Sequence, residues 1–422
     1  MATVLALDVG SSSVRAQSFD EQGEPVDELR QERYDGRDPD EIVALSREVL
    51  DGAEPHGISC FGHSLIPLDR KGKPLTELLG WRDTRSAHAA AWLRRRLDND
   101  AVHARTGAYL HPAFWPAKLA WLAESQPDVF RRAERFVSFA DYLRGEPVTS
   151  LSLASGTGLL DLTSGRWDEE LLATLGVEAE RLPELADIPV WIDGVCSNLG
   201  ASCTGGRAAL MVGTSGALRV LNETERPQPR PGLFLYLFDD RRVVEGGALS
   251  DGGNLYAWLQ ETLTPSAGVG DREHGLTFLP FLGGERSPGW DPDATGTITG
   301  ITFDTTAADI RQAALEGVGF RFAAIAELMP EIEEIVATGA ALLKDERWVQ
   351  IMADALTRPV TLSRVQEASL RGAAVAALER GGYEPPDAPL GEVFHPREER
   401  AEAYRSARER QQRLYEELRG EH

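Results

Sequence analysis

Lysine, cysteine and long apolar runs are all scarce in this sequence of 422 residues. Arginine supplies nearly all of the 44 positive charges, which face 67 acidic residues and leave a formal net charge of −23. Such an acidic chain is poorly suited to the phosphate backbone of a nucleic acid or to an anionic membrane surface. No apolar run approaches the ~20 residues that span a bilayer. We therefore expect neither nucleic acid nor membrane as a partner.

The three cysteines are odd in number and lie among apolar or small residues, at Cys60, Cys196 and Cys203. This usage predicts buried thiols in a reducing compartment rather than a disulfide framework. Neither Cys196 nor Cys203 has the neighbouring Cys or His partners of a metal site. The start of the chain lacks a basic segment and soon reaches Asp8, unlike a signal peptide. We expect a cytoplasmic protein.

The length suggests about two domains, and one pattern occurs twice along the chain. A strand, a turn of small residues and a second strand open the sequence, and the same order returns at about residue 208. Strands alternating with helices follow each copy. We predict a duplicated α/β fold with domains 1–191 and 192–422 and a ligand-binding cleft between them.

Hydrophobic spacing and capping residues predict the main helices. Asp38 is the expected N-cap of the first helix, and Asp251 is the expected cap of a helix that runs through Leu259. The predicted helices cover residues 39–50, 82–97, 115–124, 251–259, 309–328, 346–356, 369–380 and 398–418.

The first small-residue turn contains Gly10, Ser11 and Ser12, whose N–H groups and hydroxyls suit an anion. Asp8, at the end of the preceding strand, is placed to hold Mg²⁺ through water, and Arg15 offsets phosphate charge. Gly/Ser hairpin turns are common, so a structural role is the alternative for this segment alone.

A second turn and a third segment extend this pattern. Gly213 and Thr214 begin a matching turn, so two phosphate turns are expected to grip a triphosphate from both sides. Residues 336–340 end another strand in small residues. Gly339 and Ala340 would let an adenine ring and ribose lie against the backbone.

These segments, in this order and spacing, resemble the ATPase superfamily of actin, heat-shock proteins and sugar kinases, and within it the FGGY carbohydrate kinases. The strongest match is Gly296-x-Ile298-x-Gly300-Ile301, followed after seven residues by a segment that begins at Asp309 and ends at Glu316. The resemblance implies two duplicated ribonuclease-H-like domains of the actin-like ATPase type, the first mainly sugar-binding and the second mainly nucleotide-binding. It also implies an ATP- and Mg²⁺-dependent kinase.

Two segments resemble the family's sugar site. Phe61-Gly62-His63-Ser64 is similar to a segment whose His contacts the sugar, although Phe61-Gly62 replaces the usual Gln-Met. The run from Trp81 to Arg85 is similar to the Trp-x-Asp-x-Arg motif. The resemblance therefore assigns His63, Trp81 and Asp83 to the sugar. Packing is the alternative for Trp81, and a surface ion pair with Arg85 is the alternative for Asp83.

The catalytic base is assigned by the same resemblance. Phosphoryl transfer to an alcohol needs a carboxylate near the attacking hydroxyl, because a neutral hydroxyl is a poor nucleophile. Asp193-Gly194 and the following residues are similar to the family segment that carries this Asp. An N-cap role is the alternative for Asp193.

Several stretches look most like the gluconokinase branch, among them residues 154–161, 213–220 and 246–253. The predicted reaction is phosphorylation of gluconate to 6-phosphogluconate at a terminal hydroxyl. A xylulokinase, another FGGY pentulose or polyol kinase, and a non-catalytic sugar-sensing regulator are the alternatives. No arginine is singled out for the gluconate carboxylate. The sequence is compatible with a homodimer but does not set the oligomeric state.

Overall fold

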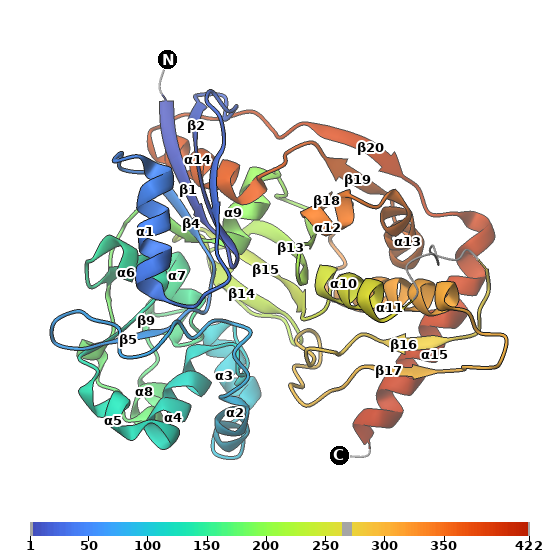
Figure 1. Cartoon of the computed structure of the whole chain (residues 1–422), viewed down its shortest axis with the longest axis horizontal. Coiled ribbons are helices and arrows are strands. Elements are labelled where there is room, and N and C mark those ends of the chain that lie inside the picture. The colour runs from blue at the N-terminus through green and yellow to red at the C-terminus, as the bar shows by residue number, and fades with distance from the viewer. Residues whose placement is uncertain (1–2, 264–271, 421–422) are drawn as a thin grey trace. The chain divides into compact units, whose positions relative to one another are not determined.

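A computed structural model describes residues 3–263 and 272–420, and the chain divides into two compact units. Unit 1 comprises Met1–Gly205, Leu221–Glu245 and Glu367–Ala388, and unit 2 comprises Gly206–Val220, Gly246–Gln366 and Pro389–His422. The units interleave along the sequence, as the colours of Figure 1 show. The boundary between residues 191 and 192 stays a prediction.

Unit 1 is built on a five-stranded sheet in the order β11-β4-β1-β2-β3. The apolar run Val4–Leu7 predicts the central strand, and its residues are buried. β1 pairs antiparallel with β2 and parallel with β4, and β4 pairs parallel with β11. The strands are β1 (Thr3–Val9), β2 (Ser13–Asp20), β3 (Arg30–Arg33), β4 (Gly57–Cys60) and β11 (Val190–Ile192).

Helices from both ends of the chain pack on this sheet (Figure 1). Helix α1 (Pro39–Leu50) begins as predicted, with the Asp38 side chain accepting from the N–H of Asp40. Helix α14 (Ala368–Arg380) packs on β1, β2 and β4 and also on α9 (Asp193–Gly200). A Cβ at Gly372 would lie 1.8 Å from the carbonyl oxygen of Cys196, so this contact requires glycine.

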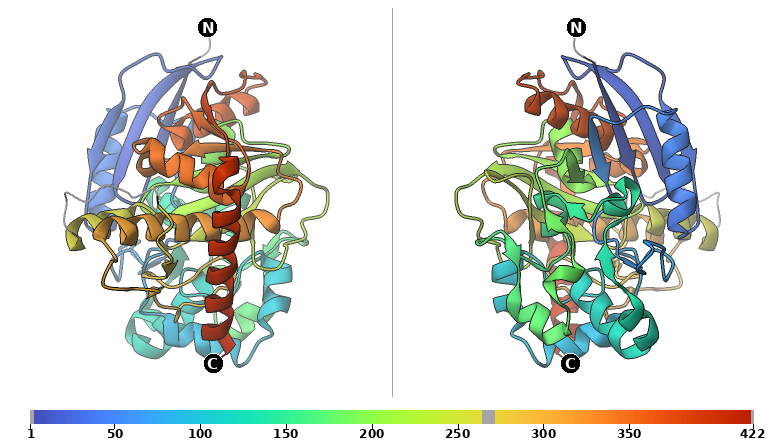
Figure 2. Two further views of the ribbon diagram at one scale, coloured as in Figure 1. Left: turned by 90° about the vertical axis from the view of Figure 1, so that its right-hand side faces the viewer. Right: turned by 90° about the vertical axis from the view of Figure 1, so that its left-hand side faces the viewer.

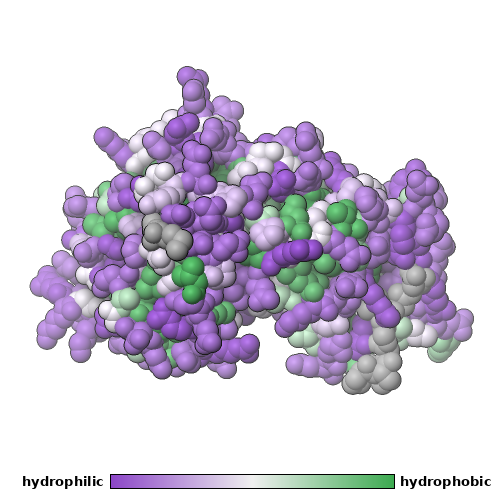
Figure 3. Space-filling model, turned by 90° about the horizontal axis from the view of Figure 1, so that it is seen from above, coloured by the Kyte–Doolittle hydropathy of each residue, from purple (hydrophilic) through white to green (hydrophobic). Residues whose placement is uncertain are grey.

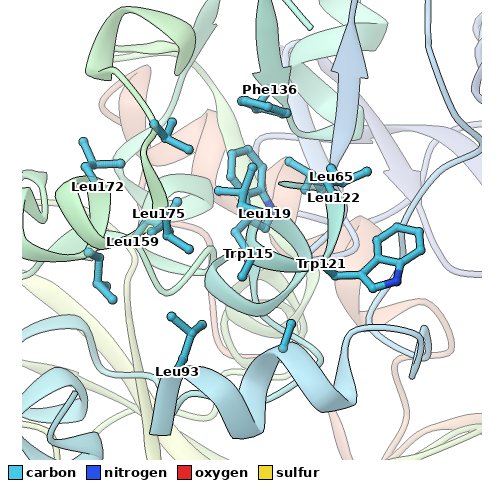
Figure 4. Packing of buried hydrophobic residues seen from close by; sticks show 14 of the residues in the cluster. Leu65, Leu93, Trp115, Leu119, Trp121, Leu122, Phe136, Leu159, Leu172 and Leu175 are labelled. Carbon is cyan, nitrogen blue, oxygen red and sulfur yellow. The ribbon is translucent and has the colours of Figure 1, made fainter. Parts of the chain in front are cut away.

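A second core fills the helical part of unit 1 (Figure 4). Trp115, Leu119 and Leu122 of α4 (Trp115–Ser125) belong to it, together with Leu65 and Phe136. The predicted helix over residues 82–97 is wrong in its extent, because α2 covers only Ala87–Arg94. Residues 82–86 instead form a turn in which the Asp83 carboxylate accepts from the N–H of Arg85.

Shorter elements complete unit 1. They are β5 (Ile66–Leu68), α3 (Asn99–Thr106), α5 (Pro127–Arg132), β6 (Arg135–Val137), α6 (Phe139–Arg144), β7 (Val148–Thr149), α7 (Leu151–Ser155), β8 (Leu160–Asp161), β9 (Arg166–Trp167), α8 (Glu169–Leu175), η1 (Ala179–Arg181), β10 (Glu184–Leu185) and β14 (Phe234–Leu237).

Unit 2 repeats the plan of unit 1. Its strands lie in the order β15-β13-β12-β18-β19-β20, and β13 and β15 continue into unit 1. β12 pairs antiparallel with β13 and parallel with β18, as β1 does with β2 and β4. This confirms the predicted duplication. The strands are β12 (Arg207–Val212), β13 (Gly216–Glu223), β15 (Arg242–Leu249), β18 (Glu334–Thr338), β19 (Val360–Ser363) and β20 (Leu390–Phe394).

The longest helices of unit 2 follow the sequence prediction closely. α11 (Ala307–Glu327) opens with a capping box between Thr306 and Asp309. α15 (Ala401–Gly420), which Figure 2 shows from the side, packs on α11, α13 and β16. The other elements are α10 (Gly253–Thr262), β16 (Thr277–Leu279), β17 (Thr297–Thr299), α12 (Ala340–Leu343), α13 (Glu346–Leu356) and η2 (Glu398–Arg400).

The contact between α9 and α14 gives a stability prediction. Gly372→Ala should destabilise unit 1 by about 1–3 kcal/mol, because the new methyl group would meet backbone that cannot move independently. The urea midpoint of tryptophan fluorescence would measure this loss. Gly420→Ala is the control, since its methyl group enters open space. Equal urea midpoints for the two variants would contradict the prediction, because they would show that α9 and α14 can move apart without loss of stability.

Candidate functional site

Three parallel strands of unit 1 end at the same edge of the sheet. Cys60 at the end of β4 lies between Val9 of β1 and Ile192 of β11 in the register of the sheet. The residues that follow each strand therefore emerge side by side, because parallel strands point the same way. This edge carries the first small-residue turn, His63 and Asp193.

Asp8 is buried at this edge, and both of its carboxylate oxygens have protein partners. Arg15 Nη1 donates to Oδ2 at 2.7 Å, and Ser59 Oγ donates to Oδ1 at 2.6 Å. Burial raises the pKa of Asp8, while Arg15 and Ser59 oppose this rise. Arg15 also contacts Glu367, at 3.3 Å. The carboxylate is thus fixed in position and retains further lone pairs for a ligand.

The turn after β1 exposes its serines. The N–H of Gly10 donates to the carbonyl of Ser13 at 2.9 Å, which closes the turn. Ser11 and Ser12 are exposed at its tip. Tyr34 holds the turn from below, with its hydroxyl donating to the Gly10 carbonyl and its N–H donating to the carbonyl of Ser12. The hydroxyl groups of Ser11 and Ser12 are therefore accessible to an anion, on a turn whose backbone is held in place by hydrogen bonds to Tyr34.

The donors at this edge suit a magnesium ion that keeps most of its water. Mg²⁺ is usually bound by one or two carboxylates together with substrate phosphates and several waters. Asp8 provides such a carboxylate. The described residues hold no group of three or more His, Cys, Asp or Glu side chains arranged around a metal. The donors at this edge therefore suit a metal ion whose other ligands come mainly from a nucleotide and water.

Asp193 is the first residue of α9, directly after β11. Its Oδ1 accepts from the N–H of Gly194 at 2.8 Å, and Ile192 occupies the N-cap position. The predicted alternative, a side-chain N-cap at Asp193, is therefore not the arrangement observed. Burial raises the pKa of the neighbouring Cys60 thiol, and the charges of Asp193 and Asp8 raise it further. Both carboxylates thus act on the same region of the sheet edge.

His63 is held in a strained conformation three residues after the end of β4. Its φ of 64° lies in the left-handed region, which is uncommon for a residue with a side chain. Ring Nδ1 is hydrogen-bonded to the carbonyl of Gly156, and Nε2 lies 3.3 Å from the hydroxyl of Tyr236. The ring is therefore fixed on both sides, with one edge against a residue far away in the sequence. Strain of this kind collects at functional sites.

Lys118 of α4 supports His63 from the protein interior. Its ammonium group donates to the carbonyl oxygens of His63 and Ala113 and is 1% exposed. Burial lowers the pKa of Lys118 to about 7, and Asp83 opposes this shift. Sequence analysis missed Lys118 and Tyr236, because only the fold brings them to His63.

Trp81 and Asp83 follow a short pairing between Leu65 and Leu79. Asp83 is buried and accepts from Arg85, while Arg37 lies 3.5 Å from its carboxylate. Burial raises the pKa of Asp83, but the hydrogen bonds from Arg85 outweigh this and hold the pKa below its usual value. The guanidinium of Arg82 lies 5.0 Å from the centre of the Trp81 ring.

The second small-residue turn lies in unit 2, between β12 and β13. The N–H of Gly213 donates to the carbonyl of Ser215 at 3.0 Å, and Thr214 is exposed. The first N–H groups of α10, from Gly253 and Asn254, donate to the carbonyls of Gly213 and Thr214. The turn is therefore braced by a helix start.

This bracing explains why the predicted cap at Asp251 is wrong. The N-cap position of α10 is Gly252. The first N–H groups of the helix donate to carbonyls of the turn and do not need a side-chain cap. Asp251 is buried and accepts instead from the N–H of Gly283 at 3.5 Å. Burial raises the pKa of Asp251 to about 7, opposed by backbone N–H groups that include Gly283.

Gly339 and Ala340 follow β18 at the neighbouring strand end. Gly339 has a φ of 89°, and a Cβ there would lie 2.6 Å from the carbonyl oxygen of Val212, the residue that precedes the turn. Ala340 is exposed at the start of α12. Two small residues therefore adjoin the second turn.

Comparisons with known proteins agree with this arrangement. The FGGY family of carbohydrate kinases matches through its N-terminal domain over residues 3–205 and through its C-terminal domain over residues 208–379. The chain belongs to the FGGY family of carbohydrate kinases. It is a kinase that uses ATP to phosphorylate a sugar, and the predicted activity class is confirmed.

Individual relatives cover almost the whole chain. A gluconokinase from Bacillus subtilis (strain 168) is 29% identical over 90% of this chain and 88% of that protein. Among solved structures, a xylulose kinase and a gluconate kinase from Lactobacillus acidophilus superpose with TM-scores of 0.89 and 0.86. Each is 25% identical and is matched over 99% of this chain and 98% of the other. The predicted two-domain fold of this FGGY kinase is confirmed.

In the described residues of this FGGY kinase, every helix is too short or too polar to cross a membrane.

The pKa of Lys118 gives a prediction of pH dependence. In the unfolded chain the Lys118 ammonium group keeps its proton up to about pH 10.5, whereas in the folded chain it releases this proton near pH 7. The contribution of Lys118 to the free energy of unfolding therefore grows as pH rises between these values. It is fully present above about pH 10.5 and lost as pH falls through 7.

The variant Lys118→Met removes this contribution. Wild type should therefore gain urea resistance relative to Lys118→Met between about pH 7 and 9. The exposed Lys73→Met is the matched control and should follow wild type. A difference in urea midpoint between wild type and Lys118→Met that stays constant across this pH range would contradict the lowered pKa of Lys118.

Proposed function

We propose that this FGGY kinase phosphorylates gluconate to 6-phosphogluconate at its terminal hydroxyl. The observation that carries the proposal is the sheet edge of unit 1, where Asp8 lies near the end of β1, and His63 and Asp193 follow the adjacent parallel strands β4 and β11. Gluconokinase and gluconate kinase relatives support the choice of substrate. Xylulokinase activity, or another pentulose or polyol kinase activity, is the alternative that the substrate test must exclude.

Asp193 is the proposed base. A carboxylate at the start of α9 can accept the proton of the attacking hydroxyl, and a helix N-terminus is a favourable place for a negative charge. His63, held from both sides of its ring, is proposed to orient the sugar. Trp81 and Asp83 complete this part of the site, with Asp83 fixed by Arg85.

The phosphate groups of ATP are proposed to bind at the two braced turns. Gly10, Ser11 and Ser12 with Arg15 form the first group, and Gly213 with Thr214 forms the second. Gly339 and Ala340 are proposed to lie against the nucleoside. Asp8 would hold Mg²⁺ through water, and this ion would offset charge that develops on the transferred phosphoryl group.

A substrate panel tests the proposed reaction. Sugar-dependent ADP release should show the highest kcat/KM with gluconate, compared with xylulose, ribulose and glycerol. The position of the phosphate in the product, read by NMR, should be the terminal carbon. A higher kcat/KM for a neutral sugar would make the enzyme a pentulose or polyol kinase instead.

A single substitution tests the base. Asp193→Asn should lower kcat by about 10²–10⁴-fold, because the amide cannot accept the hydroxyl proton. The Kd for ATP, measured by calorimetry, should not change. Asp187→Asn, at an exposed carboxylate paired with Arg380, is the matched control and should keep wild-type kcat. Near-normal turnover in Asp193→Asn would move the base elsewhere.

A further inference from the structure

The surroundings of Asp83 carry more positive than negative charge, in a chain whose net charge is −23. Arg37 and Arg85 contact Asp83 and Glu77, which leaves these four groups balanced. Lys118, when protonated, acts on Asp83 from the interior. Arg82, next to Asp83 in the chain, adds a positive charge.

Arg82 differs from its neighbours because no acidic group balances it. Within residues 3–263 and 272–420, Arg82 forms no ion pair and no hydrogen bond to a side chain. Its guanidinium stacks over Trp81 at 5.0 Å. Desolvation lowers the pKa of Arg82, with no carboxylate to oppose it. Arg82 is exposed, so its guanidinium, which has no carboxylate partner among the described residues, is accessible to an anion.

The backbone brings the segment that carries this cation against the segment that follows β4. Leu65 and Leu79 exchange both of their N–H to carbonyl hydrogen bonds, at 3.0 and 3.1 Å. Two residues further from this antiparallel pair, the two segments reach His63 and Trp81. Arg82 is therefore three residues beyond Leu79 of this pair, and His63 lies two residues before Leu65.

We propose that Arg82 binds the carboxylate of the sugar acid and so determines that this kinase prefers an aldonate over a neutral sugar. The inference rests on the proposed gluconate kinase function and identifies the group that recognises the acid end. A guanidinium matches a carboxylate through two parallel hydrogen bonds. Stacking on the Trp81 ring restrains the Arg82 side chain, so less entropy is lost on binding.

The test compares acidic and neutral substrates in Arg82→Met. The variant should raise KM for gluconate about 10- to 100-fold, the effect expected for loss of a hydrogen-bonded charge pair. Its kcat/KM for the best neutral sugar of the panel should stay within about twofold of wild type. Arg82→Lys keeps the charge without the paired donors and should fall between these values.

Arg96→Met is the matched control, because Arg96 also stacks on a tryptophan of unit 1, at 4.0 Å from the Trp92 ring centre. It should leave every KM unchanged. An unchanged gluconate KM in Arg82→Met would overturn the role of Arg82. An equal loss for acidic and neutral sugars would also overturn it, since that result indicates a structural role.

Failure of the proposed function gives a different result. If wild type does not phosphorylate gluconate, gluconate is tested instead as a competitive inhibitor of the best neutral substrate. Inhibition that Arg82→Met weakens at least tenfold would support carboxylate binding at Arg82 in an enzyme with another substrate. Inhibition that is absent, or equal in both proteins, would overturn it.

Discussion

The parallel pairing of β4 with both β1 and β11 is the constraint on which the unit 1 site depends. It sets Cys60 level with Val9 and Ile192, so the turn after β1 and the start of α9 leave the sheet together. The Ser59 hydroxyl of β4 donates a hydrogen bond to Asp8 of β1. A slip of one residue in β4 would point its side chains to the opposite face and break this contact. Hydrogen bonding of the sheet therefore sets the spacing of the site.

The helix that begins at Asp193 is fixed by a segment from near the end of the chain. Gly200 of α9 and Gly372 of α14 let the two helix backbones approach closely, since a Cβ at either would meet backbone atoms within 2 Å. The Arg371 guanidinium donates to the carbonyls of Gly23, Gly200 and Pro386. Glu367, just before α14, contacts Arg15. Unit 1 therefore needs a segment that follows residues 246–366 of unit 2 in the sequence to be complete.

Local chemistry explains which features could be predicted from the sequence. The N-cap at Asp38, the apolar strand Val4–Leu7 and the family signature after Gly296 are encoded by neighbouring residues, and the fold confirmed what they predicted. The cap predicted at Asp251 was wrong because carbonyls of the turn between β12 and β13 accept from the first N–H groups of α10. Lys118 and Tyr236 reach His63 from 55 and 173 residues away. No periodicity or motif around them indicates such contacts.

The charge of the chain explains how an acidic protein binds anions. Hydrophilic residues dominate the face seen in Figure 3. The excess of acidic groups in the chain as a whole repels ATP and a sugar acid at long range. Screening limits this repulsion to about 10 Å at ordinary ionic strength. Binding must therefore come from short-range groups, such as the braced turns and cations without an acidic partner. Most arginines near the sugar motif are already neutralised by carboxylates, as Arg85 is by Asp83. An unpaired arginine in such a chain is consequently a stronger indication of a ligand than it would be in a basic protein.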